Sequence, residues 1–273
     1  MGKPVSDKAV VLARGLGTRM RKAAGDARLT SGQAAVADTG VKAMIPIRRP
    51  FLDYVLTALA DAGWRRACLV IGPEHDELRN YYRSVDRHRM SIEFATQAEP
   101  QGTADAVAAA EGFAGGDPFL CVNSDNYYPP GPLRSLRDLH GMGLAVFEQE
   151  AMLAGSNISL DRLARFAVVR ANADGWLEQI IEKPEPSAVA ALGQPRYISM
   201  NCWRFGPQIF HACRAISPSP RGELEITDAV QYAIDSLGVR FRVVPCKAPV
   251  LDLTGRDDVA PVAERLEGLE VYL

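Results

Sequence analysis

A glycine-rich segment directly after an apolar run is the part of the sequence best suited to bind an anionic ligand. The run Ala9–Ala13 leads into Arg14-Gly-Leu-Gly-Thr-Arg19, with glycines at positions 15 and 17. Glycine allows the backbone to approach phosphate oxygens closely, and successive backbone N–H groups can then bind the anion. Arg19 adds a guanidinium that can bind phosphate through two hydrogen bonds. Because Met20 stands where the dinucleotide fingerprint G-x-G-x-x-G has its third glycine, the segment predicts a phosphate-binding loop of another kind.

The elements that must hold this loop alternate between strand-like and helix-like runs in the first half of the chain. Apolar, strand-like runs cover 9–13, 68–71, 92–95 and 119–122, and helix-like runs cover 52–62, 76–82 and 103–111. In the first of these helices Leu52, Val55, Leu56 and Leu59 share one face. Continuous apolar strands separated by amphipathic helices predict a parallel sheet covered on both faces.

The second half of the chain is less regular. Runs at 167–170 and 176–181 around Asn172–Gly175 predict a β-hairpin. Further strands are expected at 198–205, 242–244 and 249–251, and helices at 207–212, 227–236 and 257–266. The predicted fold class is therefore α/β and Rossmann-like, with a mostly parallel central sheet, helices on both faces and a β-rich substrate-binding insertion.

The composition argues against two classes of function. The 273 residues are 47% hydrophobic and 23% charged, with a formal net charge of −2, which argues against a protein that grips nucleic acid through a basic face. No apolar stretch approaches the ~18 residues of a membrane span, and we expect no membrane association. The N-terminus lacks the features of a secretory signal, and the five cysteines are scattered without a C-x-x-C pair. We therefore expect a cytoplasmic protein with reduced cysteines.

Short motifs along the chain resemble, in the same order, those of the sugar nucleotidyltransferases. This family includes glucose-1-phosphate thymidylyltransferase and the UDP- and GDP-sugar pyrophosphorylases. The motifs are Gly15–Arg19 (G-x-G-T-R), Lys42–Ile47, Gln97–Ala106, Ser124–Asn126, Glu182–Pro184, Arg221–Asp228 and Leu251–Gly255, so that the resemblance covers about residues 8 to 258. It implies a single domain over 1–273, with a nucleotide-binding part at about 8–126, a sugar-phosphate-binding part at about 127–258 and a C-terminal helix and tail at 259–273.

The resemblance implies an enzyme that transfers a nucleoside monophosphate from a nucleoside triphosphate to a sugar 1-phosphate and releases pyrophosphate. Such a transfer requires positioning and charge neutralisation rather than covalent chemistry. By resemblance, Arg19 neutralises the β- and γ-phosphates, Lys42 the α-phosphate, and Lys183 the phosphate of the sugar. Asp125 and Asp252 would coordinate Mg²⁺, the expected cofactor, and both follow apolar runs that would place them at the carboxyl edge of the sheet.

Further residues are expected to bind the two small-molecule substrates. The nucleotide would contact Leu12, Ala13, Arg14, Gly15, Gly17, Thr18, Gln97, Gly102 and Thr103. The sugar phosphate would contact Asn126, Glu182, Lys183, Asn201 and Trp203. Family analogy also favours a homo-oligomer.

The choice of base has two interpretations. Gln97 offers one acceptor and two donors and can pair with the edge of a pyrimidine, which favours UTP or dTTP. Arg14 stands where the family has a small residue, and its guanidinium could equally favour guanine. The interval from Arg19 to Lys42 is also longer than the family's, and residues 32–38 are expected to form an extra helix or a lid.

The sugar pocket has two interpretations as well. Asn201-Cys-Trp203 stands where the family has Asn-x-Gly, and Ser124 replaces the glycine before the first metal-binding aspartate. If Trp203 faces the sugar, it would occlude part of the space for a plain hexose, and glucose 1-phosphate would be a weak substrate. If strand alternation turns Trp203 into the core, Cys202 would line the pocket instead.

Other functions remain as alternatives. One is a catalytically idle, ligand-sensing member of the same fold, although Arg19, Lys42, Asp125, Lys183 and Asp252 are all retained. Another is a GTP-using enzyme that acts on a modified sugar or cyclitol phosphate. The absent third glycine argues against a nicotinamide-dependent oxidoreductase.

Overall fold

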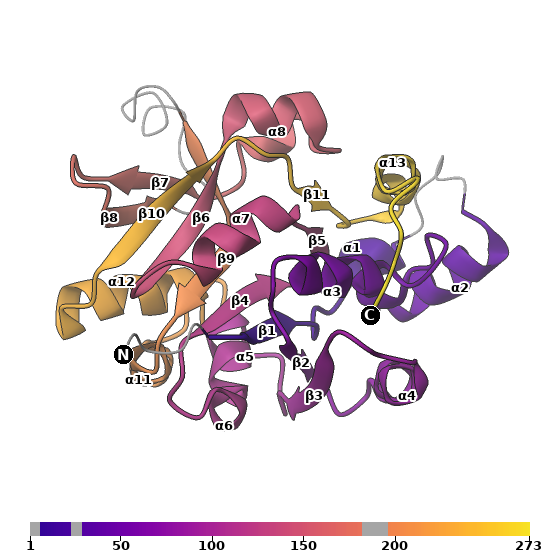
Figure 1. The fold of residues 1–273 in the computed structure, drawn as a ribbon, viewed down its shortest axis with the longest axis horizontal. Helices are drawn as coiled ribbons and strands as arrows, with labels where there is room; N and C mark the ends of the chain where they lie inside the picture. Colours follow the sequence, from indigo (N-terminus) through magenta and orange to yellow (C-terminus); the bar gives the residue numbers. More distant parts are fainter. Residues whose placement is uncertain (1–5, 23–28, 182–195) are drawn as a thin grey trace.

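Apolar runs with little polar alternation form the strands, as expected for a sheet buried on both faces. The computed structural model describes residues 6–22, 29–181 and 196–273 (Figure 1). Strand β1 (Lys8–Leu12) has the sequence KAVVL, and its three central residues are fully buried. It lies in the middle of the sheet, between two parallel neighbours.

One nine-stranded sheet runs through both halves of the chain. Its strand order is β10-β6-β9-β4-β1-β2-β3, with a hairpin of β7 and β8 attached to β9. The strands are β2 (Arg66–Ile71), β3 (Ser91–Thr96), β4 (Phe119–Asn123), β6 (Met142–Glu148), β7 (Val168–Ala171), β8 (Leu177–Ile181), β9 (Tyr197–Phe205) and β10 (Phe241–Cys246). Strand β9 is antiparallel to both β4 and β6. The predicted α/β class with a mostly parallel sheet is confirmed.

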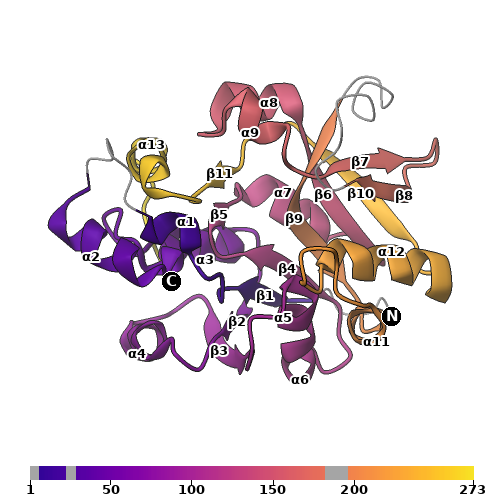
Figure 2. The same ribbon diagram turned by 180° about the vertical axis from the view of Figure 1, so that it is seen from behind.

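Helices cover both faces of this sheet. On one face α3 (Phe51–Asp61) and α7 (Pro130–Arg137) lie in front of the strands, as Figure 1 shows. On the other face lie α5 (Thr103–Ala109), α11 (Gln208–Ala215) and α12 (Ile226–Leu237), which stand in front in Figure 2. Two separate hydrophobic clusters correspond to these two faces.

The remaining elements lie around the ends of the strands. They are α1 (Thr18–Arg21), α2 (Ser31–Thr39), η1 (Lys42–Met44), α4 (Asp76–Ser84), α6 (Glu111–Ala114), β5 (Asn126–Tyr127), α8 (Gln149–Gly155), α9 (Leu160–Leu163), β11 (Leu251–Asp252), η2 (Arg256–Asp258) and α13 (Val259–Arg265). The strand expected over 249–251 is observed as β11 at Leu251–Asp252, where it pairs with the two-residue strand β5. Among the described residues, no helix has both the length and the apolar composition needed to cross a bilayer.

Helix α2 is the extra helix expected between the glycine-rich loop and Lys42. It begins with a capping box, in which Thr30 and Gln33 each bond the other's backbone N–H. Its C-terminal Gly40 meets Gly17, and both have positive φ angles, of 79° and 60°. A Cβ atom on Gly17 would lie 2.0 Å from the carbonyl oxygen of Gly40. Only glycine fits at Gly17, so the loop and α2 pack backbone against backbone.

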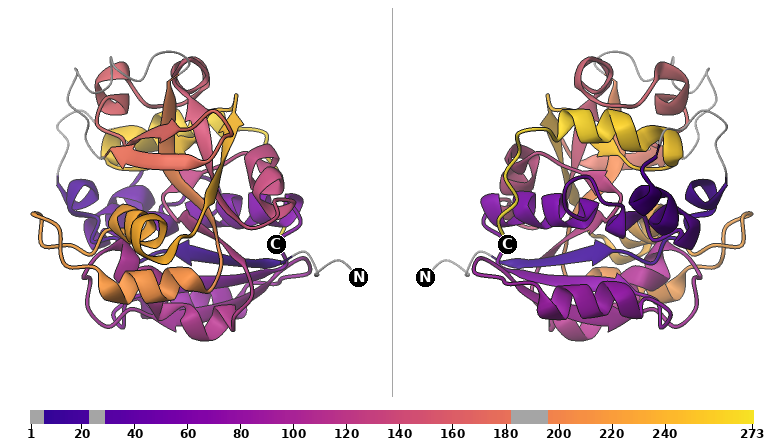
Figure 3. Two further views of the ribbon diagram at one scale, coloured as in Figure 1. Left: turned by 90° about the vertical axis from the view of Figure 1, so that its left-hand side faces the viewer. Right: turned by 90° about the vertical axis from the view of Figure 1, so that its right-hand side faces the viewer.

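The C-terminal elements lie against these N-terminal helices. Figure 3 shows α13 in yellow beside the indigo and purple helices α1 and α2. Arg256 of η2 donates to the carbonyl oxygen of Met20 at 2.9 Å and forms an ion pair with Asp38. The segment that carries Asp252 is therefore tied to the helix that follows the glycine-rich loop.

Candidate active site

A cavity of about 250 Å³ opens at the carboxyl ends of β1 and β4. Its lining includes these residues expected from the sequence: Leu12, Ala13, Arg14, Gly15, Lys42, Gln97, Gly102, Thr103 and Asp125. They come from segments far apart in the chain, which the parallel strands bring to one edge of the sheet. This is the place where open α/β sheets bind their ligands.

Backbone hydrogen bonds continue the sheet past the end of β1 and hold the glycine-rich loop in place. The N–H of Ala13 donates to the carbonyl oxygen of Val70 at 2.8 Å, and that of Ser124 donates to Leu12 at 3.0 Å. Gly15 has no atom within 4 Å of a hypothetical Cβ, so its backbone faces open space beside the cavity. The loop is thus anchored at its start and accessible at its glycine.

Gln97 lies at the wall of the cavity with its amide nitrogen already bonded. The side chain is 4% exposed, and its Nε2 donates to the carbonyl oxygen of Gly102 at 3.0 Å and to Asp105 Oδ2 at 2.7 Å. Gly102 has φ 127°, and a Cβ there would lie 2.5 Å from the carbonyl oxygen of Leu224. Gly102 must therefore be glycine. Because the amide nitrogen of Gln97 is already bonded, its side-chain oxygen is the group that can bind a ligand.

Arg14 is held by a clamp on the same wall. Its Nε and one terminal nitrogen each donate to Glu74 at 3.3 Å, and its other terminal nitrogen donates to the backbone oxygen of Gln97. The side chain of Arg14 is 7% exposed, whereas that of Glu74 is 51% exposed. The guanidinium therefore ties the glycine-rich loop to the segment after β2 and to the end of β3.

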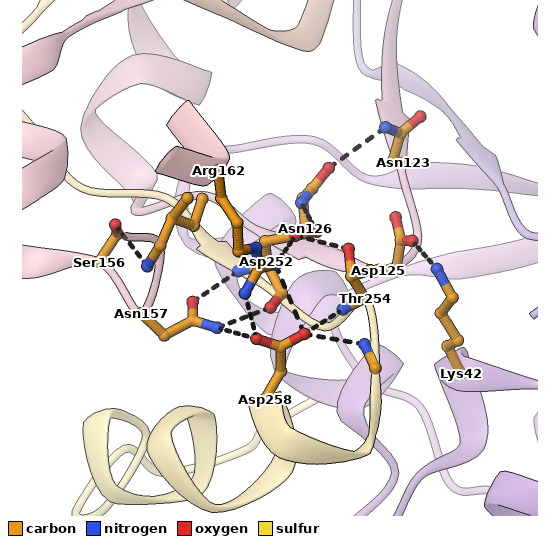
Figure 4. Close-up of polar contacts among 12 residues, drawn as sticks. Lys42, Asn123, Asp125, Asn126, Ser156, Asn157, Arg162, Asp252, Thr254 and Asp258 are labelled. Carbon is orange, nitrogen blue, oxygen red and sulfur yellow. Dashed lines mark hydrogen bonds and ion pairs between the residues drawn. The ribbon is translucent and has the colours of Figure 1, made fainter. Parts of the chain in front are cut away.

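Lys42 and Asp125 face each other across the cavity. The Lys42 Nζ donates to Asp125 Oδ2 at 2.6 Å, and their side chains are 15% and 26% exposed (Figure 4). Asp125 lies between β4 and β5, and its backbone oxygen accepts from the N–H of Leu253 at 2.8 Å. A cation and an anion, each still reachable from solvent, therefore stand beside the glycine-rich loop.

Asp252 lies next to Asp125, because β11 pairs with β5 and brings Asp252 opposite Asn126. Asp252 is 4% exposed, and its carboxylate accepts from Arg162 at 2.5 Å, from Thr254 at 2.6 Å and from Asn126 at 2.9 Å (Figure 4). Burial, and then the charge of Asp125, raise the pKa of Asp252, while Thr254 and Arg162 act in the opposite direction. The structure therefore confirms that the two aspartates lie close together.

This pair of carboxylates fits a magnesium ion by its chemistry. Mg²⁺ prefers oxygen ligands and is usually held by one or two carboxylates together with substrate phosphates. Burial and the neighbouring charge of Asp125 both disfavour the charged form of Asp252, and a divalent cation bound between the two carboxylates would offset their repulsion. The residues present therefore fit the expected metal.

Asn126 contacts Asp252 within the protein. It is 3% exposed, its amide oxygen accepts from Asn123 and Tyr128, and its amide nitrogen donates to Asp252. These contacts place the side chain of Asn126 beside the carboxylate of Asp252 and leave one N–H of its amide without a partner among the described residues. The predicted contact of Asn126 with the sugar phosphate stays a prediction.

Trp203 differs from its predicted role. It is fully buried, and its ring stacks on Phe205 with centroids 5.5 Å apart. It belongs to the cluster on the α5, α11 and α12 face and does not line the cavity. The prediction that Trp203 contacts the sugar is wrong, and the expected exclusion of a plain hexose loses its basis. Cys202 is fully buried on the opposite face, so it does not line the cavity either.

Asn201 stands out by its backbone. With φ 54° it has a positive φ, which no other non-glycine residue in the described ranges shows. It coincides with the irregularity in the pairing of β6 and β9, and its Oδ1 accepts from Trp203 Nε1 at 3.3 Å. Asparagine tolerates this conformation better than most residues. Its contact with the sugar phosphate stays a prediction.

Some predicted residues lie elsewhere. Thr18 and Arg19 are exposed on α1 and Gly17 is buried, all outside the lining of the cavity. Glu182 and Lys183 fall outside the residues that the structure describes. The assigned roles of Arg19, Glu182 and Lys183 stay predictions.

The cavity also contains residues that the sequence analysis gave no binding role. They are Leu16, Val41, Ala43, Pro100, Ala106, Asn123, Ser124 and Glu223. Of these, only Val41 and Asn123 lie outside the motifs. Glu223 lies within the Arg221–Asp228 motif, which therefore contained a signal for it. Asn157 and Arg162, which contact Asp252, belong to a segment without any recognised motif.

The sequence of this chain is similar to those of known nucleotidyltransferases. A family model described as nucleotidyl transferase matches residues 8–245. The low-salt glycan biosynthesis nucleotidyltransferase Agl11 of Haloferax volcanii is 29% identical, over 84% of this chain and 59% of the relative. The glucose-1-phosphate thymidylyltransferase of Streptomyces griseus is 30% identical, over 84% of this chain and 58% of the relative. The chain thus spans less than two thirds of the length of these two relatives.

A further relative and a solved structure match over more of their length. The UTP–glucose-1-phosphate uridylyltransferase AglF of Haloferax volcanii is 29% identical over 84% of each chain. The solved structure of a UDP-glucose pyrophosphorylase complexed with UDP-glucose aligns with a TM-score of 0.73 and 18% identity, over 95% of this chain and 97% of that one. The structural likeness establishes the shared fold. Since the family model matches most of the sequence, this chain belongs to the nucleotidyl transferase family.

Proposed function

We propose that the protein transfers a nucleoside monophosphate from a nucleoside triphosphate to a sugar 1-phosphate, with Mg²⁺, and releases pyrophosphate. The observation that carries the proposal is the cavity in which the glycine-rich loop, Lys42, Asp125 and Gln97 meet. The printed names of the relatives, a thymidylyltransferase and a uridylyltransferase that act with glucose 1-phosphate, agree with it.

The residues of the cavity have different roles in substrate binding, which follow from their charges. The glycine-rich loop offers backbone N–H groups to phosphate oxygens, and Lys42 stands beside it with a compact positive charge. Its ion pair with Asp125 keeps the ammonium at the cavity before substrate arrives, at 2.6 Å from the carboxylate. Arg19 and Lys183 would add positive charge to the departing phosphates and to the sugar phosphate.

Asp125 and Asp252 are the residues that would hold Mg²⁺. When bound, the ion supplies neutralisation of the phosphate charge. The protein contributes orientation, because Asp252 is fixed by three side-chain donors and the backbone of Asp125 is bonded to Leu253.

The wall around Gln97 favours a pyrimidine. Its amide nitrogen is occupied by Gly102 and Asp105, so the side chain presents an acceptor. Uracil and thymine carry an N–H donor between two carbonyl groups, which an acceptor can bind, as it can bind the N–H donors of guanine. The printed names of the relatives, a thymidylyltransferase and a uridylyltransferase, favour the pyrimidines. Three of the five N–H donors of Arg14 bond Glu74 and the backbone of Gln97, so the guanidinium is held against the protein rather than free to turn toward a guanine. We therefore favour UTP or dTTP as the substrate.

Pyrophosphate release from a panel of nucleotides tests the reaction and the base together. We expect release with UTP or dTTP in the presence of Mg²⁺ and a sugar 1-phosphate, and none after chelation of the metal. The measurement is kcat/KM for UTP, dTTP, CTP, ATP and GTP with one accepted sugar. A clear preference for GTP or ATP would refute the pyrimidine assignment. Nucleotide binding without any release would instead indicate an idle, ligand-sensing protein.

Breaking the clamp of Arg14 from either side tests how that residue acts. Because Glu74 is half exposed, the ion pair contributes at most about 1 kcal/mol. We expect Arg14→Ala and Glu74→Ala to raise the KM for the preferred nucleotide by similar factors of at most about five, since 1.4 kcal/mol corresponds to tenfold. Neither change should alter the order of preference among nucleotides. If Arg14→Ala alone changes that order, the guanidinium reads the base directly.

A further inference from the structure

Arg162, at the end of α9, bridges two buried carboxylates. One terminal nitrogen donates to Asp252 Oδ2 and the other to Asp258 Oδ1, both at 2.5 Å (Figure 4). The side chains of these two aspartates are 6% and 9% exposed, whereas that of Arg162 is 30% exposed. A planar guanidinium is the one side chain that can donate to two separate carboxylates from a rigid fork.

The far end of this bridge is itself fixed. Asp258 Oδ2 accepts from the backbone N–H groups of Thr254 at 3.0 Å and Gly255 at 2.8 Å. These bonds anchor Asp258 to the turn that precedes α13. Arg162 is therefore bonded to the carboxylate of Asp258, which is itself held in place. Its other terminal nitrogen in turn fixes the carboxylate of Asp252.

Asn157, between α8 and α9, fixes the backbone of the same residue. Its Oδ1 accepts from the N–H of Asp252 at 2.9 Å, and its Nδ2 donates to the carbonyl oxygen of Asp252 at 2.8 Å. The amide thus pairs with Asp252 as a neighbouring strand would. Segment 149–163, which none of the recognised motifs covers, holds Asp252 by both its main chain and its side chain.

We propose that Arg162 is a positioning residue that orients the carboxylate of Asp252 toward the metal, an inference that rests on the function proposed above. Asp252 Oδ2 is occupied by Arg162 and Thr254, while Oδ1, among the residues that the structure describes, accepts from Asn126 alone. A carboxylate oxygen has two lone pairs, so Oδ1 keeps capacity for a further partner. Arg162 fixes which oxygen stays available and keeps it pointing away from Asp258.

Binding of Mn²⁺ to the nucleotide-free protein tests the inference without using catalysis. The probe is Mn²⁺ alone, and its free concentration is followed by electron paramagnetic resonance. We expect Arg162→Gln to weaken Mn²⁺ binding by about 10–100-fold, the usual loss when a residue that orients a metal ligand is removed. Arg162→Lys keeps the charge but loses the fork, so its affinity should fall between those of the wild type and Arg162→Gln.

Arg165, an exposed arginine three positions further along the chain, provides the matched control. Arg165→Gln should bind Mn²⁺ as the wild type does, and thermal unfolding without metal identifies the folded variants. If Arg162→Gln folds and binds Mn²⁺ with wild-type affinity, the inference is overturned. If Arg162→Gln does not fold, wild-type affinity for Mn²⁺ in Arg162→Lys overturns it. A wild-type protein that releases pyrophosphate but binds no Mn²⁺ also overturns it and leaves the transfer activity standing. Absence of pyrophosphate release is a separate result, which contradicts the proposed function itself.

Discussion

Replacing Asp125 with asparagine is expected to lower kcat by ~10²–10³-fold, the scale of losing one preorganised electrostatic group. The amide has nearly the same shape as the carboxylate but carries no charge for Mg²⁺ or for Lys42. Because the side chain is 26% exposed, the fold should survive. The measurement is pyrophosphate release at saturating nucleotide and Mg²⁺, together with the midpoint of thermal unfolding. Asp252→Asn should lose as much activity and some stability as well, since Asp252 is buried against Arg162.

Asp235 offers a matched control for this substitution. It is exposed on α12, where it accepts from Gln231 one helical turn away. Asp235→Asn should leave both turnover and the unfolding midpoint close to the wild type. Near-normal turnover of Asp125→Asn at saturating Mg²⁺ would exclude Asp125 from the metal site.

Replacing Trp203 with alanine is expected to lower the free energy of unfolding by about 3–5 kcal/mol, the usual loss for a large aromatic residue removed from a core. The ring is fully buried, stacks on Phe205 and meets Phe241 edge to face with centroids 6.2 Å apart. Urea denaturation at 25 °C measures the change. We expect no gain in kcat/KM for glucose 1-phosphate, because the vacated space lies in the core rather than in the cavity.

Trp176 provides the comparison for this stability effect. It is half-buried, and its ring contacts the guanidinium groups of Arg240 and Arg242, whose central carbons lie 4.1 and 3.9 Å from its centroid. Each such contact contributes about 0.5–1 kcal/mol at an exposed site, so Trp176→Ala should cost less than Trp203→Ala. A stable Trp203→Ala protein with improved use of glucose 1-phosphate would restore the idea that the indole limits the sugar pocket.

The strands around β1 could be predicted from sequence because their signal is local. A run such as Phe119–Val122 is apolar throughout, and burial on both faces leaves no alternation to interpret. Residues 127–166 were harder, and β6, α7, α8 and α9 had no assignment. Short apolar runs such as Met142–Phe147 suit a strand or a buried helix equally, and only the pairing of β6 with β9 and β10 decides.

The candidate site was predictable where a motif identifies chemistry, and less so where packing decides. Gln97 and Asp125 meet in one cavity because they follow β3 and β4, which end at the same edge of the sheet. Lys42 joins them because it follows α2, whose C-terminal Gly40 contacts Gly17. Whether Trp203 faces a ligand or the core depends on the register of β9 against β4, which alternation alone does not fix. Arg162 has no motif, and its role emerges only once β11 and α9 are neighbours in space.

The contact between Gly17 and Gly40 has a mechanical consequence. Neither glycine has a side chain that could move aside, so Gly17 cannot shift toward Gly40 without displacing the end of α2. Asp38 in α2 is paired with Arg256, whose guanidinium also bonds the carbonyl oxygen of Met20 after the loop. The glycine-rich loop, α2 and the turn at η2 are therefore mechanically coupled. A displacement of the loop would also displace the turn that supports Asp252. A change in the length of the segment before Lys42 would alter how tightly these three elements are coupled. It would leave the side chains that line the cavity unchanged.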